Sequence, residues 1–232
     1  GVESLGLLTT GDHNVAVGKG ALYNNTTAGY NTAVGSGSLA SNTTGLDNTA
    51  IGYDALVSHT TGNNNVAVGN NALDAVTTGQ YNTAVGRKAG TSITTGNGNT
   101  LFGYEAGKSR TTGANMTAIG YNALYSATTA DQCVGIGDNA LRSITTSGES
   151  VAVGTNALYS ATGSYSTAVG RYTNMLLTTG EYNTSFGRMA GYHTTTGSYN
   201  VNLQGSPSTA TASNQITLGD TNHSYLRCND TS

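Results

Sequence analysis

The stretch Asn31-Thr32-Ala33-Val34-Gly35 returns seventeen residues later as Asn48-Thr49-Ala50-Ile51-Gly52, and then as Asn65-Val66-Ala67-Val68-Gly69. The closing glycines of these copies recur every 17 residues from Gly18 to Gly187, apart from one step of 16. A period near twenty residues is typical of solenoids in which each repeat forms one turn, here called a rung. The sequence therefore predicts an all-β parallel β-solenoid of about twelve 17-residue coils.

The period divides the chain into three segments. Residues 1–13 are predicted to form a lead-in half-rung, residues 14–204 the repeating β-roll, and residues 205–232 a non-repeating C-terminal tip. The chain has 33 glycines, one proline, 9% charged residues and a net charge of −3. Low hydrophobicity alone would suit a disordered linker, but disorder normally brings high net charge, and a regular period favours an ordered coil.

Composition also excludes some partners. The nine Lys and Arg residues are scattered along the sequence, which argues against a nucleic-acid-binding surface. No apolar run approaches the ~20 residues that a membrane-spanning helix needs, so membrane insertion is not expected.

Two columns of side chains alternate along the short strands. The column of Val34, Ile51, Val68 and Val85 is apolar in every copy and is predicted to face the interior of the coil. The alternate column is small, and it is predicted to face outward and to form the interface of a side-by-side homotrimer. The proposed interface residues are Ala16, Ala33, Ala50, Ala67, Ala84, Ala118, Ala152 and Ala168.

The rest of the repeat predicts further packing. Ala-Leu pairs such as Ala55-Leu56 supply a second interior column, and where Leu becomes Gly, as in Ala89-Gly90, Phe102 on the strand is expected to fill the space. The glycine of each Thr-Thr-Gly corner, such as Thr43-Thr44-Gly45, is expected to supply a positive φ. The recurring asparagines, beginning at Asn14, are expected to stack as an amide ladder.

The phrases Asn14-Val15-Ala16-Val17-Gly18 and Asn65-Val66-Ala67-Val68-Gly69 resemble the head repeat of trimeric autotransporter adhesins. The resemblance covers roughly residues 14–204. It implies that each chain is a left-handed parallel β-roll and that three rolls pack about a threefold axis. The rung here is longer than that family's usual one, and the extra residues fall at the Thr-Thr-Gly corner.

A second resemblance lies near the C-terminus. Residues 214–220 and 225–228 look like the segment before the self-cleaving intramolecular chaperone of phage tail fibres and endosialidases. That chaperone assembles a trimer and cuts itself off after a Ser, which implies that Ser232 is the chaperone-release terminus. Together the two resemblances suggest a phage-type tail fibre, or a bacterial fibre adhesin of that origin, in an extracellular location on a virion or a cell surface.

Candidate receptor-binding residues are aromatic or lie in the non-repeating tip. Tyr30, Tyr81, Tyr165, Tyr182 and Tyr199 share one corner, and Tyr53, Tyr104 and Tyr121 share another. Tyrosine suits sugar rings because it pairs an apolar face with a hydroxyl, although these rings could instead only cover neighbouring rungs. Past Gln204 the period stops and polar residues cluster, so binding is placed more at the tip than along the shaft. The candidates are Asn222, His223, Tyr225, Arg227, Tyr182 and Tyr199.

No catalytic, metal-binding or cofactor-binding residue is predicted. Glycosidases need two carboxylates at a defined separation, and no pair of acids recurs in such a setting. The four histidines occupy different phases of the repeat without metal-ligand spacing. The prediction is a non-enzymatic trimeric fibre or adhesin segment that attaches a virion or cell to a bacterial surface glycan or outer-membrane component. A tailspike-like polysaccharide depolymerase is the main alternative, and an ice-binding threonine ladder is a weaker one.

Overall fold

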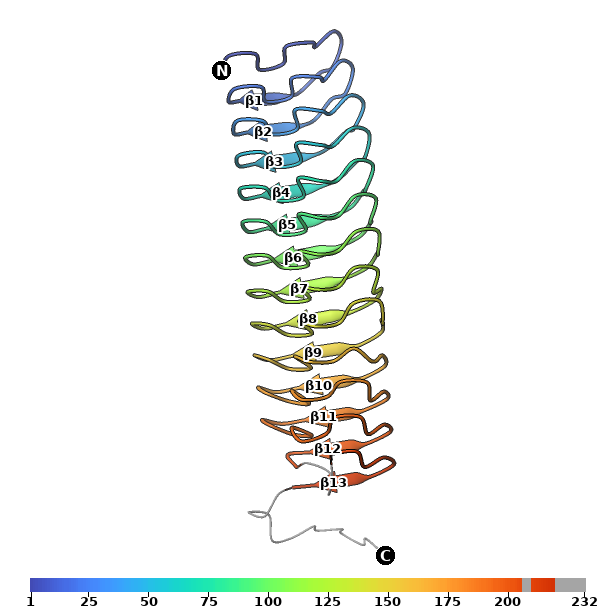
Figure 1. Ribbon diagram of the computed structural model, residues 1–232. Helices are drawn as coiled ribbons and strands as arrows, with labels where there is room; N and C mark the ends of the chain where they lie inside the picture. Colours follow the sequence, from blue (N-terminus) through green and yellow to red (C-terminus); the bar gives the residue numbers. More distant parts are fainter. Residues whose placement is uncertain (206–209, 220–232) are drawn as a thin grey trace, which may run out of the picture.

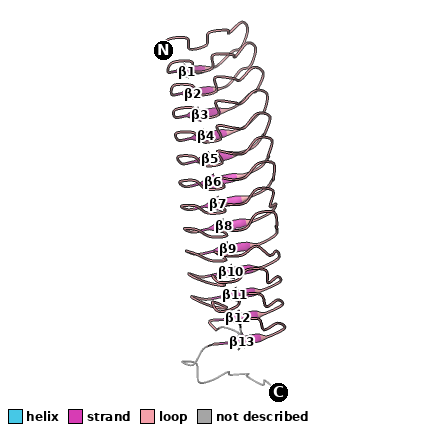
Figure 2. Ribbon diagram, in the orientation of Figure 1, coloured by secondary structure: helices cyan, strands magenta, loops and turns pink. Residues whose placement is uncertain are grey.

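The computed structural model describes residues 1–205 and 210–219 and shows a single stack of coils (Figure 1). Each rung contributes one three-residue strand, and the remaining residues are turns and irregular segments (Figure 2). The strands are β1 (Val15–Val17), β2 (Thr32–Val34), β3 (Thr49–Ile51), β4 (Val66–Val68), β5 (Thr83–Val85), β6 (Thr100–Phe102), β7 (Thr117–Ile119), β8 (Val134–Ile136), β9 (Val151–Val153), β10 (Thr167–Val169), β11 (Thr184–Phe186), β12 (Val201–Leu203) and β13 (Ile216–Leu218).

The strands form one parallel sheet in sequence order, β1 to β13, with equivalent residues of the repeat side by side. The predicted parallel β-solenoid of 17-residue coils is therefore confirmed. The sheet continues one strand beyond Leu203, because Val201 pairs with Ile216 in β13. Periodicity missed β13 because Ile216 follows its partner Val201 by only 15 residues and because Gln215 takes the asparagine position.

The two strand columns face opposite to the prediction. Ala33, Ala50 and Ala84 are fully buried inside a single coil, whereas Ile51 and Phe102 are 40% and 39% exposed. Ala67, Ala118, Ala152 and Ala168 are likewise buried, and Ala16 is half-buried in the end rung. The interpretation of the Ala column as a trimer interface is therefore wrong, because these side chains face their own coil.

The narrow width of the coil explains the small column. Gly135 takes the alanine place in β8, and a Cβ there would already lie 3.1 Å from the Leu124 side chain and 3.2 Å from the carbonyl oxygen of Ala140. The Ala-Leu segment, confirmed as an interior column, thus lies directly across from the strand. The strand alanines are small because the interior of a single coil is narrow at this point. The larger Val, Ile and Phe side chains of the strand point outward.

A larger strand residue does fill the space where the interior leucine becomes glycine, but that residue is Leu101 and not Phe102 as predicted. Leu101 replaces the strand alanine and is fully buried, whereas Phe102 points outward. A Cβ at Gly90 would lie 2.6 Å from Leu101 Cδ1, and a Cβ at Gly107 would lie 2.9 Å from Leu101 Cδ2. Leu101 therefore fills the space left by leucine on its own rung and on the preceding one.

The leucine column itself adopts left-handed backbone geometry, with φ near 50° at residues such as Leu22 and Leu73. Such angles are rare for a bulky residue, and the complete burial of these side chains compensates for the local strain. Gly90, with φ 63°, has the same geometry. The Thr-Thr-Gly prediction was wrong on this point, since Gly45 and Gly62 lie outside the left-handed region. Glycine is needed there because a Cβ on Gly62 would lie 2.1 Å from the carbonyl oxygen of Gly79 on the next rung.

The predicted asparagine ladder is confirmed. The Asn65 side-chain oxygen accepts the backbone N–H of Asn82 at 3.0 Å, and the Asn82 amide donates to the carbonyl oxygen of Gly96 at 2.8 Å. All of these groups are buried. The ladder therefore supplies hydrogen bonds to interior backbone groups of consecutive rungs.

We expect Asn82→Leu to lower the free energy of unfolding by several kcal/mol, because each buried backbone group left without a hydrogen-bond partner costs about 1–3 kcal/mol. Thr78→Leu changes an exposed residue of the preceding Thr-Thr-Gly corner and serves as the control. Chemical denaturation followed by circular dichroism compares the two variants. Equal stability of both would contradict a structural role for the ladder.

Candidate binding corners

Four predicted receptor-binding residues lie outside the part of the chain that the structure describes. They are Asn222, His223, Tyr225 and Arg227, and the predicted release terminus Ser232 lies there too. The remaining candidates, Tyr182 and Tyr199, lie on the turns of the solenoid.

The first corner precedes each asparagine of the ladder and is called the tyrosine corner. Tyr165, Tyr182 and Tyr199 stack there, with ring centroids 4.8 Å and 4.9 Å apart and planes within 10°. Both faces of Tyr182 are covered by its neighbours. The stacked rings therefore offer edges and hydroxyls rather than open faces, which favours the alternative that they cover neighbouring rungs. Acidic residues but no Lys or Arg lie on the described part of this corner; the acids are Asp12, Asp47, Asp131, Glu149 and Glu181.

The second corner is the turn that follows the glycine at the end of each strand, and it is called the basic corner. Of the Lys and Arg residues that the structure describes, all but Arg110 occupy the sixth, seventh or tenth place of the repeat on this corner. They are Lys19, Arg87, Lys88, Lys108, Arg142, Arg171 and Arg188. Along the sequence these cations look scattered. Sorting them by place in the repeat, rather than by sequence order, would have shown that they share one side of the coil.

Aromatic rings alternate with cations on the basic corner. Lys108 and Arg142 each lie 5.0 Å from the ring centroid of Tyr125, and Arg142 also lies 5.7 Å from that of Tyr159. Such stacking holds the side chains along the axis of the solenoid. Hydrogen bonding to Glu105 and Tyr125 raises the pKa of Lys108, so its charge is retained.

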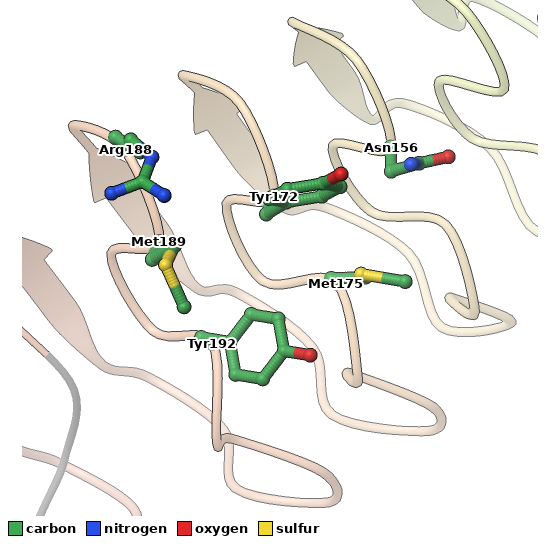
Figure 3. Close-up of a pocket in the computed structure, with 6 residues that line it drawn as sticks. All are labelled: Asn156, Tyr172, Met175, Arg188, Met189 and Tyr192. Atoms are coloured by element: carbon green, nitrogen blue, oxygen red, sulfur yellow. The ribbon is translucent and has the colours of Figure 1, made fainter.

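A hollow of about 410 Å³ opens on the basic corner near the C-terminal end of the stack. Its walls come from three successive rungs, β9 to β11, and consist of Asn156, Tyr172, Met175, Arg188, Met189 and Tyr192. Figure 3 shows Arg188 at one side of the hollow and Asn156 at the other, with the tyrosines and methionines between them. Arg188 is exposed and has no ion pair or hydrogen bond with any described residue.

The remaining buried ionisable groups have structural partners. Arg110 donates to the carbonyl oxygens of Gly113, Ala114 and Ala130 and pairs with the exposed Asp131. Met116 occupies the ladder position of this rung, where an asparagine amide would donate to the carbonyl oxygen of Ala130. The Arg110 guanidinium makes that hydrogen bond instead. Burial lowers the Arg110 pKa, while Asp131 opposes that shift.

His59 and Cys133 are also interior residues without signs of reactivity. Burial lowers the pKa of His59, and its Nε2 lies 2.8 Å from the carbonyl oxygen of Gly62. Burial likewise raises the pKa of the Cys133 thiol, which disfavours the nucleophilic thiolate. Neither group lies at a corner where a ligand could reach it.

Within the described residues, no group of three or more His, Cys, Asp or Glu side chains could hold a metal ion. The same part of the chain contains no helix able to cross a membrane. Comparison of the chain with models of protein families, with curated proteins and with solved structures finds no match.

Proposed function

We propose that this chain is a homotrimeric fibre segment that attaches a virion or a cell to a bacterial surface glycan. In this proposal three left-handed rolls pack side by side, outside the cell, as the resemblance to trimeric autotransporter adhesins implies. The resemblance of the C-terminal residues to the segment before a self-cleaving chaperone supports the phage-type origin.

The observation that carries the proposal is the outward face of the sheet. One column, from Val17 to Leu218, is apolar in every strand; the other, from Val15 to Ile216, is Thr in seven strands and Val or Ile in the remaining six. At a strand spacing of ~4.8 Å, thirteen strands give a face ~60 Å long and ~10 Å wide, or ~600 Å². A continuous apolar column of this length on the surface of a soluble protein marks an interaction site.

Copies of the same chain are the partners that fit this face. Every strand presents the same kind of side chain at the same rise, so a second solenoid in register matches each rung with an equivalent rung. An unrelated globular surface lacks this repeat and would match only a few strands. In a threefold arrangement each chain divides this face of ~600 Å² between two contacts, and the total approaches the ~800 Å² that each partner buries in a stable interface.

Attachment is assigned to the corners, because they stay outside a trimer built through the sheet. The basic corner combines tyrosine rings with cations and contains a hollow, features that suit polar ligands with apolar faces. A polysaccharide depolymerase is the alternative function, and a repeated shaft would suit it as well as an adhesin.

One experiment separates the two functions. We expect the purified protein to be retained on immobilised capsular polysaccharide or lipopolysaccharide, and we expect the polysaccharide to keep its chain length after prolonged incubation. Size-exclusion chromatography of the polysaccharide measures chain length. Release of oligosaccharides would establish the depolymerase in place of the adhesin, and absence of retention on every preparation would contradict glycan attachment.

A further inference from the structure

The hollow formed by rungs β9 to β11 differs from the rest of the basic corner in its residues. Tyr172 and Met189 adopt left-handed geometry, with φ of 62° and 61°. On seven preceding rungs this place is taken by Asp, Asn, Lys or Glu, which are Asp54, Asn71, Lys88, Glu105, Asn122, Asn139 and Asn156. Large side chains adopt this geometry elsewhere in the solenoid too, among them Leu73, Lys88 and Tyr182. The hollow is therefore distinguished by its residue types, since an aromatic ring and a thioether stand where the preceding rungs have polar side chains.

The interior behind the hollow also departs from the repeat. Thr173 and Asn174 replace the Ala-Leu pair of the tenth rung, and both are buried. The Thr173 hydroxyl lies 2.7 Å from the carbonyl oxygen of Gly187, the residue immediately before Arg188. Thr173 therefore joins two of the three rungs of the hollow, those of β10 and β11, by a side-chain hydrogen bond that an alanine could not make.

Cations outnumber acids on the basic corner around the hollow. Arg142, Arg171 and Arg188 lie on this corner in rungs β8 to β11, where Asp138 is the one acid of the corner; the other acids of the stretch, Glu149 and Glu181, lie on the tyrosine corner. The Arg171 guanidinium donates to the Tyr172 hydroxyl at 2.7 Å and lies 4.3 Å from its ring centroid. Arg188 alone is left without a partner among the described residues, and its guanidinium is available to an anion.

We propose that this hollow binds a carboxylated sugar unit of an acidic polysaccharide, with the carboxylate on Arg188 and the ring against Tyr172 and Tyr192. A guanidinium pairs with a carboxylate through two parallel hydrogen bonds, and aromatic rings pack on the apolar face of a sugar. The volume of about 410 Å³ lies within the usual range of small-ligand sites, ~300–1,000 Å³. This inference rests on the proposed glycan attachment and adds the chemical class of the glycan.

The surroundings favour a carboxylated polymer over a sulfated or phosphorylated one. Highly charged polyanions are held by many cations at once, and their binding falls steeply with salt. Here one unpaired guanidinium lies among two methionines, two tyrosines and a neutral amide. Such a site recognises a single charge on an otherwise uncharged ring.

The test uses the full chain and immobilised polygalacturonate, with the same polymer after reduction of its carboxyl groups to alcohols and a sulfated polysaccharide as comparison surfaces. We expect binding to polygalacturonate that the reduced polymer loses. Arg188→Gln should weaken that binding roughly ten- to hundred-fold, the range for losing a hydrogen bond between charged groups. Tyr192→Ala should weaken it as well, and Tyr192→Phe should restore it.

Arg87→Gln is the matched control, since Arg87 occupies the same place in the repeat, on the rung of β5, where it lies over the ring of Tyr104. It removes the same charge and should leave binding unchanged. Thermal melting of each variant checks that the fold is kept. The proposal is overturned if the two arginine variants lose binding equally, if the reduced or sulfated polymer binds as well, or if polygalacturonate does not bind at all. Binding only to neutral glycans would overturn this inference while leaving the proposed attachment function intact.

Discussion

The variant Ala84→Asp should fail to fold, whereas Val85→Asp, one residue further on, should keep the β-sheet signal of the wild type. Ala84 is fully buried inside the coil, and Val85 points outward from the same strand. A carboxylate at residue 84 would lie unpaired among the interior alanines and leucines of neighbouring rungs. An uncompensated charge in a protein interior costs about 3–5 kcal/mol of the free energy of unfolding, a large part of the total stability of a domain.

Far-ultraviolet circular dichroism and thermal melting compare the two variants directly. Ala84→Ser controls for the loss of a methyl surface without adding a charge and should remain folded. A folded Ala84→Asp beside an unfolded Val85→Asp would reverse the two faces of the strand. That result would contradict the observed burial and restore the opposite assignment, in which the Val column is interior.

A second large effect is expected on assembly. Phe102→Glu combined with Ile119→Glu should prevent trimer formation, because each trimer would then hold six carboxylates in the proposed interface. The two residues are 39% and 38% exposed in the single chain, so their substitution leaves the interior unchanged. Like charges held close together in an apolar interface repel each other and lose their water, and each effect opposes association.

The matched control for assembly is Thr95→Glu combined with Thr112→Glu. Both threonines are exposed on the Thr-Thr-Gly corner of adjacent rungs, away from the sheet face. Sedimentation velocity should show loss of the trimer in the first pair and an unchanged mass in the second. Equal behaviour of the two pairs would place the interface elsewhere on the coil.

The period of the sequence was sufficient to predict the solenoid, the parallel register, the asparagine ladder and the Ala-Leu interior column. Each of these depends only on which residues recur at a fixed spacing. The direction of the strand columns depends on the width of the coil, which spacing does not reveal. Alternation shows that Ala33 and Val34 face opposite sides, but an alanine suits both a narrow interior and a close contact between chains.

The candidate site was only partly accessible to sequence analysis. Tyr182 and Tyr199 were found as a recurring corner, yet their ring faces are covered by stacking that depends on the rise between rungs. The hollow was missed because its residues come from three rungs and differ in type, so no single column marks it. Only the three-dimensional stack brings Arg188 together with Tyr172 on the preceding rung.

The mass of the wild-type protein in solution tests the central claim most directly. Light scattering coupled to size-exclusion chromatography, at a concentration well above that of any monomer–trimer transition, measures it without reference to shape. A trimer gives three times the chain mass of 23.5 kDa, and this is the result that the outward apolar face predicts. A folded wild-type monomer would show that this face is stable in water, and it would contradict the assembly on which the proposed fibre depends.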